Sequence, residues 1–190
     1  MPTVYNSLMQ PLGLLSFLLL TAMLGYMMYR WPGGVDKTFS QNAARFKESS
    51  IYYAVGLVVV LALLSVFVLG WFVAAMKLST VFASVFLLGI AGQTTAALVP
   101  ETTGMRKTIH IAASAVMYLV TLIIVGMLAL HTAVPVTGRI AAAAGFGVML
   151  MLSLAIIVDK RLLRYAMVIQ AIHLASFYII LLVSTYSLQP

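Results

Sequence analysis

The sequence predicts an all-α, polytopic membrane protein with six transmembrane helices and with its N-terminus and C-terminus both outside. Of its 190 residues, 63% are hydrophobic and 8% are charged, whereas soluble domains carry about 25% charged residues. The apolar residues form long unbroken runs, and a helix needs about 20 such residues to cross a bilayer core of about 30 Å. The charged side chains lie between these runs, and the basic ones gather in alternate loops.

Six runs are long enough to cross a membrane, and their continuity favours helices over the alternating strands of a barrel. We expect one domain, residues 1–190, with spans at about 8–29, 51–76, 78–99, 108–130, 139–158 and 162–187. Trp31-Pro32-Gly33-Gly34 ends the first span and turns the chain. Pro11, Pro100 and Pro135 fall at span ends, where proline terminates a helix rather than kinking it.

The first loop is the long one, and its second half has a helical pattern. Phe39, Ala43 and Phe46 share one face between Thr38 and Ser50. Two interpretations remain open: a short helix lying at the headgroups, or an N-terminal extension of the second span. Neither of them requires a partner.

The distribution of basic residues predicts the orientation. The first, third and fifth loops hold Arg30, Lys37, Arg45, Lys47, Arg106, Lys107, Lys160, Arg161 and Arg164. The second and fourth loops hold only Lys77 and Arg139. The positive-inside rule therefore places the odd-numbered loops in the cytoplasm and both termini outside, as in a multi-pass plasma-membrane protein. The same rule explains the net charge of +7 without a nucleic-acid partner.

Small residues indicate where helices touch. The third span contains Gly89, Gly92 and Ala96, and the fifth contains the alanine run 141–144 followed by Gly145. Such residues let two backbones approach closely in lipid. Packing inside the bundle is favoured over a dimer interface, while a homo-oligomer or a larger membrane assembly stays open.

No Asp, Glu, Lys or Arg lies in the middle of a span. Ion-coupled transporters, proton pumps and voltage sensors usually keep ionisable residues there. The chain has no cysteine, and its three histidines lack zinc-ligand spacing. We therefore expect no catalytic residue, no metal site and no enzyme activity.

The polar residues that remain inside the spans lie in one half of the membrane. At 1.5 Å per residue, Gln93, Ser114, Gln170 and His173 lie between about 9 and 14 Å from the cytoplasmic end. His110 shares a face of the fourth span with Ser114, and Glu101 lies near the expected mouth. These faces predict a pocket open to the cytoplasm whose ligand-binding residues are Gln93, Glu101, His110, Ser114, Gln170 and His173.

Two other interpretations of these residues remain. Polar side chains in lipid often only hydrogen-bond between helices, contributing about 0.6–2 kcal/mol each. Alternatively, His110 and His173 could ligate a haem b, although His173 lies about 9 Å deeper than His110.

The segment Gln93 to Gly104, followed by His110-Ile111-Ala112-Ala113, carries a resemblance. A polar end of the third span, a Pro-acid-x-x-Gly turn and a histidine opening the fourth span resemble a bacterial and archaeal six-helix membrane family of unknown function. That family is similar to the eukaryotic DRAM and Sfk-type membrane proteins. The resemblance implies a prokaryotic source and a cytoplasmic-side cluster at Pro100, Glu101 and His110, and it implies no known reaction.

The favoured function is binding of a lipid or another neutral or amphipathic ligand, or a role as a small membrane module. A pocket without fixed charge suits such a ligand better than an ion. The alternatives are a transporter or channel for a neutral solute and a bis-histidine electron-transfer protein. Membrane lipids are the expected partners, and no cofactor is expected unless haem is bound.

Overall fold

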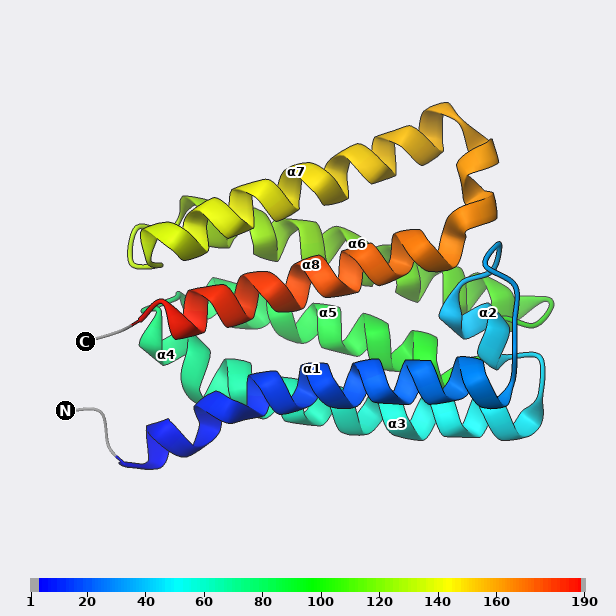
Figure 1. Cartoon of the computed structure of the whole chain (residues 1–190), viewed down its shortest axis with the longest axis horizontal. Coiled ribbons are helices and arrows are strands. Elements are labelled where there is room, and N and C mark those ends of the chain that lie inside the picture. Colours follow the sequence, from blue (N-terminus) through cyan, green and yellow to red (C-terminus); the bar gives the residue numbers. More distant parts are fainter. Residues whose placement is uncertain (1–3, 189–190) are drawn as a thin grey trace.

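The structure, a computed structural model, describes the backbone of residues 4–188 and the side chains of residues 9–188. Six helices are long and apolar enough to cross a membrane, and they lie side by side along the length of the molecule (Figure 1). No strand occurs among the described residues. The prediction of an all-α protein with six helical spans is confirmed.

The helices follow one another in the order α1 (Val4–Arg30), α2 (Phe39–Ala43), α3 (Lys47–Phe67), the π-helical turn η1 (Val68–Phe72), α4 (Val73–Ala75), α5 (Thr80–Leu98), α6 (Met105–Leu130), α7 (Val136–Val158), the 3₁₀ segment η2 (Lys160–Tyr165) and α8 (Ala166–Tyr186). Helices α3 and α4 with η1 between them form the second span. Helix α1 begins at Val4, so Pro11 lies inside it and not at its end as expected.

The six spans form a closed ring. Each packs against the next in chain order, from α1 through α3, α5, α6 and α7 to α8, and α8 packs against α1. Short connections favour this arrangement, because consecutive antiparallel helices are then neighbours. Helices α6 and α8 face each other across the ring with little direct contact, which leaves room between them.

Glycine allows the closest approach in the ring. A Cβ on Gly92 of α5 would lie 2.9 Å from the backbone oxygen of Ala113 in α6. A Cβ on Gly145 of α7 would lie 2.5 Å from Ile180 in α8. The small residues noted in the sequence at these positions therefore serve contacts inside the bundle.

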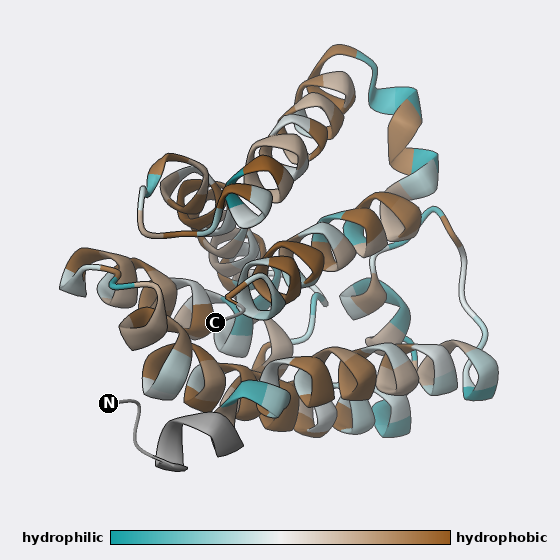
Figure 2. Cartoon of the chain, turned by 60° about the vertical axis from the view of Figure 1, so that its left-hand side comes forward, coloured by the Kyte–Doolittle hydropathy of each residue, from teal (hydrophilic) through white to brown (hydrophobic). Residues whose placement is uncertain are grey.

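We call the end of the bundle that holds the segments 31–46, 99–104 and 159–165 the basic end. The basic residues that the sequence assigned to the odd-numbered loops lie in or beside these segments. Figure 2 shows hydrophilic residues gathered at the helix ends, notably in η2, while the helices themselves are mostly hydrophobic. Outward side chains such as Leu18, Leu119 and Ile157 are more than half exposed, as lipid contact requires.

Helix α2 is a separate short helix in the first loop, as one of the two interpretations expected. The other interpretation, an extension of the second span through this segment, is wrong, because that span begins separately at Lys47. Phe39 and Ala43 are buried against the bundle, whereas Phe46 is 45% exposed. Helix α2 therefore folds over the basic end of the ring (Figure 1).

Candidate functional site

A cavity of about 680 Å³ lies inside the basic half of the ring, among α5, α6, α7 and α8. A volume of this size is within the range that small-molecule ligands occupy. All six residues that the sequence nominated line this cavity: Gln93, Glu101, His110, Ser114, Gln170 and His173. The cavity wall is otherwise largely apolar, with residues such as Ala96, Ile111 and Leu174.

The cavity also reaches between α7 and α8. Ile156 of α7, Leu163 of η2 and Ile169 of α8 line it there. Figure 1 shows the two helices diverging toward η2, which bridges them. The wall on this side is apolar, and Leu163 is 48% exposed, so the cavity comes close to the outer surface of the bundle here.

Helix α2 covers the cavity at the basic end. The Phe39 backbone N–H donates to Gln170 Oε1 over 2.8 Å, and the Gln41 side-chain amide donates to Glu101 Oε1 over 3.2 Å. The Ser40 hydroxyl lies 3.1 Å from His110 Nε2. Three nominated residues thus hold α2 in place, and this helix lies over the end at which the sequence predicted an opening.

His110 is fixed by groups from two segments, α2 and residues 99–104. Its Nδ1 lies 2.7 Å from the Val99 carbonyl, which can only accept, so Nδ1 carries a proton and donates. In the neutral ring Nε2 then accepts from the Ser40 hydroxyl. Glu101 Oε2 is 3.7 Å from the same nitrogen, and the pairing that the sequence suggested forms when the ring is protonated.

His173 belongs to a separate network that the sequence did not reveal. Its Nδ1 donates to the Ile169 carbonyl over 2.8 Å, and its Nε2 contacts the Tyr118 hydroxyl. The Tyr118 hydroxyl also contacts the Ser153 hydroxyl and lies 3.2 Å from the Met149 carbonyl. This network links α6, α7 and α8 across the wall of the cavity.

The positions of the histidines bear on the haem interpretation. Each directs Nδ1 to a carbonyl of the backbone and Nε2 to a hydroxyl, and the two hydroxyls belong to α2 and α6. One haem iron would require both Nε2 atoms to leave these hydroxyls. As they lie, the two rings serve different hydrogen-bond networks.

Gln93 and Ser114 are the nominated residues without such contacts. Neither side chain forms a hydrogen bond with the described residues, and Gln93 Oε1 is completely buried. Gly92 of α5 lies against Ala113 and Met117 of α6, so Gln93 and Ser114, each next to one of these contacts, lie at the same level.

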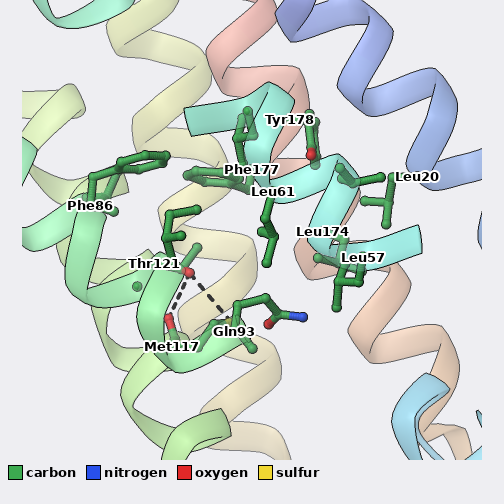
Figure 3. A pocket seen from close by; sticks show the side chains of 15 residues that line it. Leu20, Leu57, Leu61, Phe86, Gln93, Met117, Thr121, Leu174, Phe177 and Tyr178 are labelled. Atoms are coloured by element: carbon green, nitrogen blue, oxygen red, sulfur yellow. Dashed lines mark hydrogen bonds between the residues drawn. The ribbon is translucent and has the colours of Figure 1, made fainter. Parts of the chain in front are cut away.

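A second, smaller space continues inward from Gln93. It has a volume of about 70 Å³ and shares Gln93, Met117, Thr121, Leu174 and Phe177 with the large cavity. Its remaining wall is almost wholly apolar, with Leu20, Leu57, Leu61 and Phe86 among its residues (Figure 3). We call it the inner cavity.

The sequence missed Ser40, Gln41, Tyr118 and Ser153. Tyr118 follows Ser114 by one helical turn and so lies on the same face of α6. It was not predicted as a site residue because its side chain is mostly an apolar ring. Ser153 lies in a span that was noted only for its small residues. The α2 residues lie in a loop, and nothing local in the sequence shows that a loop folds back over a bundle.

Comparisons with known proteins identify no relative: no family model, no curated protein and no solved structure matches this chain.

Proposed function

We propose that this membrane protein binds a neutral or amphipathic ligand, such as a lipid, in the cavity at its basic end, and that it does so without catalysis. The observation that supports this most is the cavity itself, with its apolar wall and a few convergent polar groups. Of the described residues that line it, Glu101 is the one carboxylate, and none is lysine or arginine. A neutral ligand suits such a lining because Glu101, which already accepts from Gln41 of α2, is the one charged side chain described there.

The basic loops support a cytoplasmic location for this end in a plasma membrane, by the positive-inside rule. A lipid of the adjoining leaflet would then reach the cavity sideways, between α7 and α8, where Ile156, Leu163 and Ile169 form an apolar wall. Access through the mouth would instead require α2 to lose its three hydrogen bonds.

Transport of a neutral solute is the second candidate, and the inner cavity is the observation that favours it. This space continues the large cavity toward the opposite end of the bundle. Beyond it, however, Phe67, Phe72 and Leu128 are completely buried and fill the interior. This dense packing favours binding over transport.

Native mass spectrometry of the detergent-purified protein tests the proposal. We expect a bound lipid-sized species on the natural protein and its loss in Ser114→Trp, because the indole would fill the cavity. Ala112→Trp is the matched control, since Ala112 lies on the exposed side of the same helix and does not line the cavity.

The proposal fails if the natural protein carries no bound species, or if Ser114→Trp retains the species at the same occupancy. A Soret band in the purified protein would instead support haem ligation by His110 and His173.

A further inference from the structure

The amide of Gln93 is exceptional among the polar groups that line the large cavity. Gln170, Glu101 and His110 are bonded to α2, and His173 is bonded to Tyr118. Thr121 donates to the Met117 carbonyl of its own helix over 2.8 Å. Among the described lining residues, Gln93 is therefore the one with a buried side-chain polar atom that has no hydrogen-bond partner, and it lies at the junction with the inner cavity.

Gln93 Oε1 lacks a hydrogen-bond donor among the described residues, at a place where the surrounding side chains are apolar. Its Oε1 has no accessible surface and no hydrogen bond within the described protein, which is costly for a buried acceptor. Figure 3 shows the side chain reaching from α5 toward Leu57 and Leu174, across the junction of the two cavities. Leu57 and Leu174 cannot donate, and Oε1 is covered in this rotamer, so it can meet a donor inside the cavity only when the amide turns toward it.

We infer that Gln93 is the residue that recognises a hydroxyl group on a neutral long-chain ligand, and that Ser114 assists it. When the ligand binds, the Gln93 amide turns toward the cavity and Oε1 accepts from the ligand hydroxyl. The Ser114 hydroxyl, at the same level, is free to donate to the ligand oxygen. The apolar part of the ligand fills the large cavity between α7 and α8 and reaches the inner cavity past Leu57 and Phe86. This inference rests on the proposed function and names the chemical class of its ligand.

Charge around the cavity favours an alcohol over a fatty acid of equal length. Glu101 is at the mouth, and no lysine or arginine lines the cavity among the described residues. A carboxylate would therefore lose its hydration without gaining a cationic partner. An alkane would leave Gln93 Oε1 unpaired, as it is now.

Photolabelling tests this inference. The probe is a sixteen-carbon primary alcohol that carries a diazirine in its chain. Its length is roughly that of one bilayer leaflet. It is compared with the matching fatty acid and the matching alkane on the full chain in lipid nanodiscs. Mass spectrometry of the digested protein locates the label.

We expect the alcohol to label residues around the two cavities, and Gln93→Met to reduce this labelling by about two- to tenfold, the range for one hydrogen bond. Thr94→Val is the control, because Thr94 is the neighbouring polar residue of α5 and lines neither cavity. In the absence of probe, Gln93→Met should be at least as stable as the natural protein, since it removes an unpaired acceptor.

The outcomes distinguish lipid binding by the cavity from recognition of the hydroxyl by Gln93. If no probe labels the cavities, lipid binding itself is refuted. If the alcohol labels them equally in Gln93→Met, or the alkane labels the natural protein as strongly as the alcohol does, lipid binding stands and the role of Gln93 is refuted. If Gln93→Met is less stable without probe, Gln93 is a packing residue and the inference is likewise overturned.

Discussion

At the scale of single residues, the structure separates two roles for polar side chains inside the spans. His173 and Tyr118 are mutually satisfied and join three helices, as polar residues in lipid commonly do. Gln93 and Ser114 have no such partners and face the cavity. The sequence grouped Gln93, Ser114 and His173 by depth and helical face, because both follow from counting along a helix whereas hydrogen-bond partners do not.

The bond between Tyr118 and His173 should contribute measurably to stability. We expect Tyr118→Phe to lower the free energy of unfolding by about 1 kcal/mol, because the His173 Nε2 acceptor loses its donor. Unfolding by sodium dodecyl sulfate, followed by circular dichroism, measures this change.

A double-mutant cycle with His173→Leu should show a coupling energy of about 0.5 kcal/mol or more. Tyr29→Phe is the control and should change nothing, since Tyr29 is 82% exposed. Strict additivity in the cycle would mean that the Tyr118–His173 contact contributes nothing.

At the scale of elements, α2 and the loop before it are held by local hydrogen bonds. Thr38 begins α2 in a capping box with Gln41. The Asn42 side chain bonds both to the N–H and to the carbonyl of Gly34. A Cβ on Gly33 would lie 2.0 Å from Asn42 Oδ1, so this turn requires glycine. These contacts fold the loop into a cap of fixed shape over the cavity.

Weakening the cap should expose the cavity to water-soluble reagents. The chain has no cysteine, so Ser114→Cys gives a single thiol inside the cavity. We expect it to react slowly with a charged maleimide. Adding Ser40→Ala and Gln41→Ala should accelerate the reaction by roughly tenfold or more, because two hydrogen bonds of about 0.5–1.5 kcal/mol each are lost.

A single cysteine at Lys107→Cys provides the control for this experiment. Lys107 is exposed at the basic end, and its reaction rate should not respond to changes in α2. Equal rates for Ser114→Cys with and without the two α2 substitutions would show that α2 does not limit access from the aqueous side.

At the scale of the whole molecule, the ring of six spans gives the protein two different ends. The basic end carries α2, the basic loops and the large cavity, whereas the opposite end is filled by buried side chains such as Phe67 and Phe72. The basic loops and the large cavity thus lie at the same end. The orientation of the protein in the membrane therefore determines the leaflet from which a ligand would come.

The orientation can be measured directly in intact cells that express the protein. By the positive-inside rule, a membrane-impermeant maleimide should label Thr132→Cys, in the α6–α7 connection, without permeabilisation. It should label Lys107→Cys only after the membrane is opened. The reverse pattern would place the cavity on the outer side and contradict the proposed leaflet.

The sequence by itself determined the number of spans, the side on which basic residues gather, and the depth of the polar residues. These properties depend on the lengths of apolar runs and on residue spacing along helices, which are local. The six residues predicted from the sequence surround one cavity. This agrees with their predicted depths, because side chains at equal depth on neighbouring helices lie close together.

Only the tertiary structure decided which of these residues are already satisfied. The closure of the ring by α8 against α1, the fold of α2 over the mouth, and the bonds of Tyr118 and Ser40 all join segments that are distant in the chain. Because such contacts depend on how whole helices pack, no local pattern encodes them, and they alone distinguish Gln93 from its bonded neighbours.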